Sequence, residues 1–116
     1  MSQLKKLFEP IKIGNVEIRN RIVMAPFGGG GGYAKDEMVT ERAKAFYRER
    51  AKGGAGLILM GLLCPIDTKV SMMPGALAIY KDEFIPGLRE LTDAVHAEGA
   101  KMGLQLSFYG WWAKRG

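Results

Sequence analysis

Gln105 is the polar residue best placed for binding chemistry, because it lies near the end of an otherwise apolar, strand-like run. Residues 101–106 alternate in character, and Met102, Leu104 and Leu106 share one expected face. The alternation puts Gln105 on the opposite face. A carboxamide there can donate and accept hydrogen bonds, as the edge of a heterocycle requires, or it can be a hydrogen-bonded member of a packed layer.

Five consecutive glycines, residues 28–32, raise the question of a phosphate-binding loop. The dinucleotide pattern Gly-x-Gly-x-x-Gly fails because its last glycine would fall on Tyr33, and no Gly-Lys-Ser/Thr sequence follows. Glycine restricts the backbone little. We therefore expect a flexible loop, with Tyr33 as a surface residue rather than a substrate ligand.

The other reactive and aromatic side chains carry weaker signals. His96 lies inside an expected helix, where a structural or solvated role is favoured over catalysis. Cys64 is the only cysteine, which excludes an internal disulfide and favours an inert thiol. An aromatic cluster follows residues 101–106 and fits either a pocket, including a cage for a cationic substrate, or core or interface packing. The cluster consists of Phe108, Tyr109, Trp111 and Trp112.

Composition indicates a globular protein and disfavours several classes of partner. The chain has 116 residues, 47% hydrophobic and 25% charged, with a formal net charge of +5. Lysine and arginine are spread along the chain without a dense basic block, so we expect no nucleic-acid partner. The N-terminus lacks a secretory signal, and no apolar stretch reaches the roughly 18 residues of a membrane span. We expect a cytoplasmic protein with no membrane partner.

The elements that position these residues alternate between strands and helices. Residues 11–18 predict a hairpin around Gly14-Asn15, and residues 22–25 a buried strand that Pro26 closes. Thr40 is an expected N-cap for a helix over residues 41–52. A second strand is predicted at residues 57–60, then a helix from Pro86 to Gly99, and a third strand at residues 101–106. This order predicts an α/β fold with a parallel sheet.

Three segments of the chain resemble the old yellow enzyme family, which includes the NADH:flavin oxidoreductases, 2,4-dienoyl-CoA reductase and trimethylamine dehydrogenase. They are LFEPIKIGNVEIRNRIVMAP, RAKGGAGLIL and LTDAVHAEGAKMGLQL, in the family's order and spacing. The resemblance runs from Leu7 to about Gly110. It implies that residues 1–116 are one portion of an FMN-binding TIM (β/α)8 barrel: the N-terminal β-hairpin, the first three strands and two helices. Three strands cannot close a barrel, so the segment needs the remainder of the barrel or a partner chain.

The resemblance also implies where FMN lies, across the carboxyl ends of the strands. The cofactor-binding positions it implies are Pro26, Phe27, Gly28, Leu62 and Gln105. The glycine run is then expected to cover the flavin. Three positions depart from the family pattern: Gly28 offers only its backbone, Leu62 would crowd the ring, and the sequence from Ser107 onward lacks the usual His-x-Gly-Arg.

The expected function is an ene-reductase-type FMN oxidoreductase, in which NADH or NADPH reduces FMN and the flavin passes hydride to an activated C=C bond of a small molecule. The resemblance places the catalytic residues after this segment, so none is assigned here, nor any metal ligand. A 4Fe–4S cluster and FAD, which larger members carry, would likewise lie outside it. Homo-oligomerisation stays open. The alternative is a non-catalytic barrel fragment or subunit with a structural or assembly role.

Overall fold

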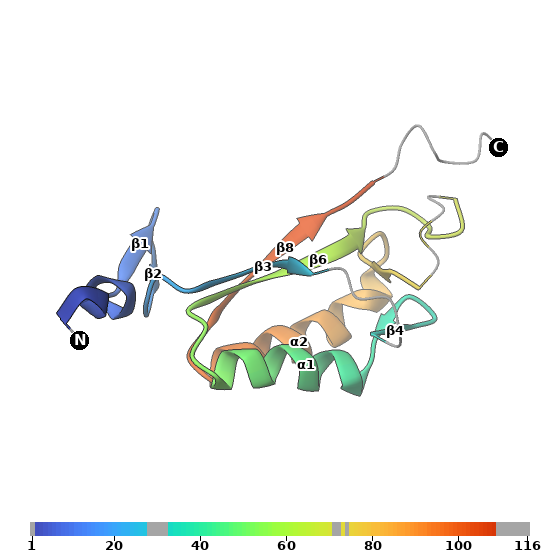
Figure 1. Ribbon diagram of the computed structural model, residues 1–116. Helices are drawn as coiled ribbons and strands as arrows, with labels where there is room; N and C mark the ends of the chain where they lie inside the picture. The colour runs from blue at the N-terminus through green and yellow to red at the C-terminus, as the bar shows by residue number, and fades with distance from the viewer. Residues whose placement is uncertain (1, 28–32, 71–72, 74, 109–116) are drawn as a thin grey trace.

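The chain folds as a parallel sheet covered on one face by two helices. The computed structural model describes residues 2–27, 33–70, 73 and 75–108 (Figure 1). The sheet contains β3 (Val23–Phe27), β6 (Leu57–Cys64), β8 (Lys101–Leu106) and the short β7 (Leu77–Ala78). Strands β3, β7 and β8 all pair parallel to β6. The parallel α/β prediction is therefore confirmed.

The helices and the smaller elements surround this sheet. Helices α1 (Glu41–Lys52) and α2 (Ile85–Ala97) lie side by side beneath it (Figure 1). The N-terminal unit lies apart, at the amino-terminal end of β3, and comprises η1 (Ser2–Phe8), β1 (Ile11–Ile13) and β2 (Val16–Ile18). A second hairpin, β4 (Ala34–Lys35) and β5 (Met38–Val39), precedes α1, and η2 (Asp82–Phe84) precedes α2.

Helix α1 has the predicted bounds and α2 lies within two residues of them, for identifiable physical reasons. The Thr40 hydroxyl accepts a hydrogen bond from the Ala43 amide at 3.2 Å, which satisfies one free N–H group at the start of α1. Pro86 occupies the first turn of α2, where no N–H donor is needed. After α2 the chain turns at Gly99, whose φ of +83° is costly for other residues.

The strands differ from the sequence prediction in length. Strand β3 begins at Val23 and runs on to Phe27, so Pro26 lies inside the strand rather than closing it. Strand β6 continues four residues beyond the predicted end, to Cys64. No sequence pattern predicted η1, the β4–β5 hairpin, β7 or η2. These pieces are too short to show a hydrophobic period, and β7 pairs with a part of β6 that is 14 residues away in sequence, Leu77 with Leu63.

The hydrophobic core lies between the sheet and the helices. Ile58 and Met60 of β6 are fully buried against Leu91 and Val95 of α2 and against α1. Met24 and Met102 of the flanking strands pack onto the same cluster. The helix-facing alternation predicted for residues 101–106 therefore holds at Met102. Leu104 and Leu106 stay 41% and 61% exposed because β8 is the outermost strand described.

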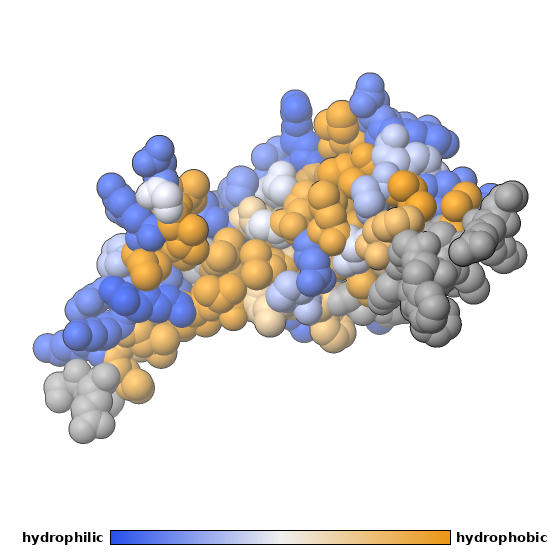
Figure 2. Space-filling model, turned by 90° about the horizontal axis from the view of Figure 1, so that it is seen from above, coloured by the Kyte–Doolittle hydropathy of each residue, from blue (hydrophilic) through white to orange (hydrophobic). Residues whose placement is uncertain are grey.

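The opposite face of the sheet is uncovered in the described structure. Figure 2 looks down on this face and shows apolar residues gathered along its middle. Val23 is 49% exposed there, and Leu57 and Leu59, which alternate with the buried Ile58 and Met60, are half-buried. Residues 22–25 were predicted to be buried on both faces, which is wrong for the described part of the chain, because Val23 and Ala25 are exposed. In a closed barrel this face becomes the interior.

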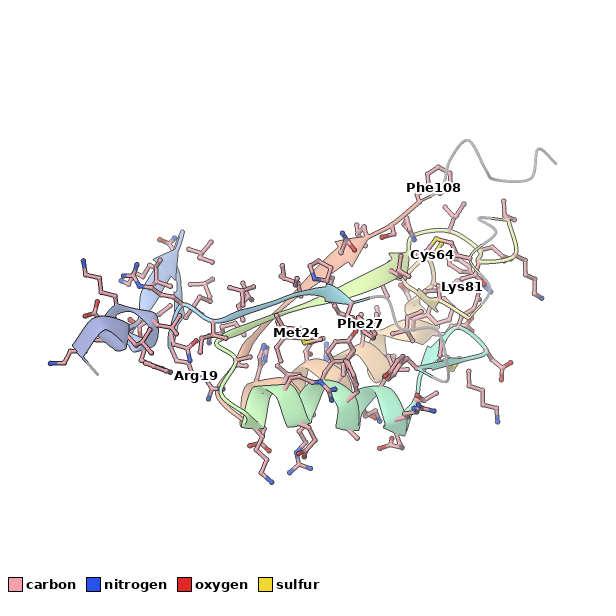
Figure 3. All side chains as sticks on the ribbon, in the orientation of Figure 1. Arg19, Met24, Phe27, Cys64, Lys81 and Phe108 are labelled. Carbon is pink, nitrogen blue, oxygen red and sulfur yellow. The ribbon has the colours of Figure 1, made fainter. Side chains whose placement is uncertain are left out.

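Arg19 ties the amino-terminal end of the sheet to both helices. Its Nη1 donates to the Glu98 carbonyl at 2.7 Å, and its Nη2 donates to the carbonyls of Ala51 and Ala55 at 2.5 and 2.8 Å. Glu98 and Ala51 lie at the carboxyl ends of α2 and α1, where unpaired carbonyls and the helix dipole favour a cation. Figure 3 shows Arg19 at the junction between β2 and β3.

Asn20 completes the tie beside Arg19. It is buried, its side-chain amide donates to the Gly54 carbonyl at 2.7 Å, and its side-chain oxygen accepts from the Ile22 amide at 3.0 Å. The amino-terminal ends of the strands are thus held by polar side chains that satisfy backbone groups at the helix ends.

Candidate functional site

The carboxyl half of the sheet contains two irregularities in strand pairing, and the first lies in β3. Met24 pairs with Ile58 and Phe27 with Met60, so Ala25 and Pro26 together stand opposite the single residue Leu59. Proline lacks the N–H group that a regular ladder needs, so a bulge is one of the few strand positions that accommodates it. Pro26, a sequence-predicted site residue, is exposed at this bulge.

The second irregularity lies between β6 and β8, farther along β6. Leu104 pairs with Met60 and Leu106 with Leu63, so Gly61 and Leu62 stand opposite the single residue Gln105. Regular pairing then resumes, as the Ser107 amide donates to the Leu63 carbonyl at 3.0 Å. Two predicted site residues, Leu62 and Gln105, therefore face each other across one bulge. Bulges recur at barrel rims and next to active sites, where they redirect side chains.

Leu62 adopts a left-handed backbone conformation inside this bulge, with a φ of +57°. For a residue with a Cβ atom this conformation is unfavourable, and strained backbone tends to occur at functional sites. The side chain of Leu62 is half-buried. Strain at this position is an independent sign that the strand end is built for something other than packing.

Gln105 lies on the uncovered face of the sheet, as the alternation predicts. Its neighbour Leu104 is in register with Met60, which faces the helices, so Gln105 faces away from them. On the same face, a side chain at Gly103 would collide with Leu59, whose Cδ2 atom would lie 2.7 Å from the added Cβ. The Gln105 side chain is exposed, and no hydrogen bond joins its carboxamide to another described residue. It is thus available to a ligand on this face.

Phe27 turns toward the helices rather than toward the uncovered face (Figure 3). Its ring stacks on Phe46 of α1 at a centroid distance of 5.7 Å, and its carbonyl accepts a hydrogen bond from the Tyr47 hydroxyl at 3.2 Å. Burial of that hydroxyl raises the pKa of Tyr47 to about 12, so Tyr47 stays a donor at neutral pH. Only the backbone of Phe27 is therefore available on the uncovered face. Gly28 lies outside the described residues.

Tyr33 packs on the same ring as Phe27. The Tyr33 and Phe46 ring centroids are 5.0 Å apart, and the Tyr33 carbonyl accepts from the Thr40 amide at 3.2 Å. The guanidinium of Arg50 covers Phe46, 3.5 Å from its centroid. Tyr33 is thus a half-buried packing residue rather than the surface residue predicted. A sequence pattern does not show that Phe27 and Tyr33 share one neighbour.

Glu37 is a polar residue near the site that sequence reasoning missed. Its Oε1 atom accepts from the Thr68 amide at 2.9 Å and from the Thr68 hydroxyl at 2.6 Å, and its Oε2 atom accepts from the Tyr80 hydroxyl at 2.6 Å. Thr68 and Tyr80 are 31 and 43 residues away in sequence, and no motif connects them. The network joins the segments that follow β3 and β6.

The remaining candidates play minor parts. Cys64 is buried at the end of β6, which fits the prediction of an inert thiol. His96 is exposed at the last turn of α2, toward the amino-terminal end of the sheet and thus opposite the carboxyl strand ends. Phe108 is 53% exposed just beyond β8, and the rest of its predicted aromatic cluster, Tyr109, Trp111 and Trp112, lies outside the described residues.

Two features are absent from the described part of the chain. No group of three or more His, Cys, Asp or Glu side chains is arranged to hold a metal ion. No helix in the described part of the chain combines the length and the apolar character needed to cross a membrane.

Comparison with known proteins identifies the family of this chain. The model of the NADH:flavin oxidoreductase / NADH oxidase family matches residues 6–115. The chain is 49% identical over 100 residues to a metal reductase from Desulforamulus reducens, a match that covers 86% of the chain and 14% of that protein. It is 44% identical over 108 residues to a cinnamate reductase from Clostridium sporogenes, covering 90% and 16%. The chain therefore spans about a sixth of these relatives.

A solved structure with a similar fold is the old yellow enzyme homologue from Zymomonas mobilis. The TM-score is 0.77 at 33% sequence identity, and the match covers 90% of this chain and 28% of the other. Structural neighbours of this kind are TIM barrels. The described strands and helices thus correspond to the first part of such a barrel, as predicted.

Proposed function

Because the chain belongs to the NADH:flavin oxidoreductase / NADH oxidase family, we propose that it forms the first part of the FMN site of an ene-reductase-type oxidoreductase. The observation that carries the proposal is the pair of bulges. Pro26, Leu62 and Gln105 come from three different strands, and each lies in a pairing irregularity toward the carboxyl end of the sheet. Active sites of barrel enzymes are built at that end.

The residues present fit one edge of a flat heterocycle. Gln105 supplies an exposed carboxamide that donates and accepts hydrogen bonds, which suits the pyrimidine side of a flavin ring. Pro26 and the backbone of Phe27 supply an edge without charge, and Gly28, which lies outside the described residues, continues this edge in the proposal. Leu62 supplies an apolar contact, although its side chain crowds the ring. We assign these five positions as the chain's contribution to FMN binding.

The chemistry itself belongs to the cofactor. Bound FMN supplies hydride transfer, taking reducing equivalents from NADH or NADPH and passing them to an activated C=C bond of a small molecule. The residues of this chain bind and orient: Gln105 fixes the ring edge, and the apolar stripe of Val23, Leu57 and Leu59 excludes water beneath it. We assign no catalytic residue to the described segment.

The site is partial in this proposal, and the other strands of the barrel complete it. An apolar groove of about 300 Å³ runs between α2 and β8 and is lined by Ile85, Leu88 and Leu104, among others. Together with the exposed edge of β8, it fits the next strand and helix of a barrel. We propose that these come from the same protein or from a partner chain, and that the assembled protein is cytoplasmic. Homo-oligomerisation is compatible with this arrangement.

The test is flavin content and flavin reduction. We expect the complete gene product to be yellow when purified, and the flavin bands to bleach when NADH or NADPH is added without oxygen. A small activated alkene should then restore the bands. A colourless protein that takes up no added FMN would refute this function. It would favour the alternative, a structural or assembly role, for which the bulky side chain of Leu62 at the site is the specific observation, because it would crowd a flavin ring.

A further inference from the structure

The β4–β5 hairpin turns on Asp36 and Glu37, and a glutamate rarely occupies such a turn. Lys35 pairs with Met38, so Asp36 and Glu37 form a two-residue connection, and both have positive φ, at +52° and +66°. Turns of this kind favour Asn-Gly or similar pairs, because a Cβ atom makes positive φ unfavourable. A glutamate held in this conformation indicates that its side chain has a use.

The Glu37 side chain binds two separate points of the connection between β6 and α2. One carboxylate oxygen accepts two hydrogen bonds from Thr68, which lies just after β6, and the other accepts one from Tyr80, which lies just after β7. The Glu37 backbone carbonyl adds a fourth bond, from the Ala78 amide at 3.0 Å. Glu37, in the connection between β3 and α1, therefore binds both ends of the connection between β6 and α2.

The surroundings favour the charged form of this carboxylate. Partial burial raises the pKa of Glu37, but the hydrogen bonds from Thr68 and Tyr80 and the charge of Lys81 outweigh it, so the pKa lies below its usual value. Thr68 is 5% exposed, so its two donors have little access to water. Hydrogen bonds to a charged acceptor are stronger than those to a neutral one.

We propose that Glu37 is a positioning residue that fastens the connection after β3 to the connection after β6 and so fixes the wall of the flavin site. The inference rests on the proposed function, since these two connections leave the strand ends that carry Pro26 and Leu62. It assigns a role to a residue outside the five proposed flavin positions. Releasing Glu37 lets the Leu62 end of β6 move relative to β3, and the flavin ring then loses a fixed support.

Four substitutions in the complete gene product test the tie itself. E37M keeps the length of the side chain and removes all three of its hydrogen bonds, T68V and Y80F each remove one donor, and D36N is the matched control. Asp36 shares the turn and the positive φ but is exposed. Hydrogen exchange followed by mass spectrometry, in flavin-free protein, reports residues 65–70 and 77–80.

We expect E37M to speed exchange in both segments by about tenfold, which corresponds to the loss of one or more hydrogen bonds to a charged acceptor. D36N should leave exchange unchanged. T68V and Y80F should each have an effect in the wild-type background and little effect in E37M, because their common acceptor is gone. Unchanged exchange in E37M, or full additivity with Y80F, would overturn the tie.

The second measurement separates positioning from stability. At a temperature where all variants are folded by circular dichroism, we expect E37M to raise the FMN dissociation constant about tenfold, and E37Q, which keeps one acceptor oxygen for Thr68, to raise it less. Faster exchange with unaltered FMN affinity would overturn the positioning role. If the wild type binds no FMN, the proposed function fails instead, and the exchange data alone decide the tie.

Discussion

The two ends of the parallel sheet are built on different principles. At the amino-terminal end, Arg19 and Asn20 satisfy backbone groups, and the pairing of β6 with both neighbours is regular. At the carboxyl end, both ladders are interrupted, and Leu62 has a positive φ. The polar side chains at the amino-terminal end stabilise the fold. The carboxyl end has an irregular backbone instead. A barrel enzyme is expected to differ in this way, with residues for stability at the amino-terminal end and the active site at the carboxyl end.

The largest expected effect lies at the amino-terminal end. We expect R19M to lower the free energy of unfolding by about 3 kcal/mol, since hydrogen bonds from a charged donor are each worth roughly 1.5–3 kcal/mol. Urea denaturation of the complete gene product measures it. The control is R48M, which removes an exposed ion pair of 2.9 Å to Glu98 and should cost under about 1 kcal/mol. Equal costs for the two variants would contradict the comparison.

Gly99 gives a second test of the same end. A Cβ atom at Gly99 would lie 2.8 Å from Arg19 Nη1, and its φ is +83°. We expect G99A to cost about 2 kcal/mol, part backbone strain and part displacement of Arg19. Gly75 has a similar φ of +80° and open space around it, so G75A should cost only about 1 kcal/mol. The difference in urea midpoints isolates the contact with Arg19.

Leu62 tests the carboxyl end. At an ordinary strand position alanine is more stable than glycine, but the positive φ should reverse that order. We expect L62G to exceed L62A in unfolding free energy by about 1 kcal/mol, because only glycine adopts this backbone without strain. Thermal and urea unfolding both report the order. If L62A is the more stable of the two, the strain does not exist in solution.

The smallest expected effect is the pH dependence contributed by Glu37. Because the pKa of Glu37 is lower in the folded protein, its contribution to stability is full above the unfolded value, about 4.3, and declines as pH falls through the folded pKa. Lys81 and the Tyr80 hydroxyl are the charged and titratable groups that act on it. Comparing urea midpoints of wild type and E37Q, we expect their difference to shrink below about pH 4.3. A constant difference would mean that the charge is irrelevant.

Sequence reasoning succeeded wherever the signal is local. Thr40, Pro86 and Gly99 mark the helix ends because capping and backbone preferences act within a few residues. Strict alternation over residues 101–106 gave the orientation of Gln105. These features need no knowledge of distant partners.

The parts that were missed depend on residues far apart in the chain. A bulge exists only relative to the strand beside it, so neither the one at Pro26 nor the one at Leu62 is visible in a single segment. The β4–β5 hairpin was missed because its turn lacks the usual glycine. Arg19 and Glu37 bind groups more than 30 residues away, and no periodicity connects them.

The central claim, that the strand ends hold a flavin edge with Gln105 as the contacting amide, is tested most directly by FMN titration of wild type, Q105L and K101M. Lys101 starts the same strand on the same face, so K101M controls for general disturbance. The account predicts an FMN dissociation constant about tenfold higher in Q105L and unchanged in K101M. The tenfold change corresponds to the loss of roughly one or two neutral hydrogen bonds from Gln105 to the flavin. Equal affinities for wild type and Q105L would contradict it.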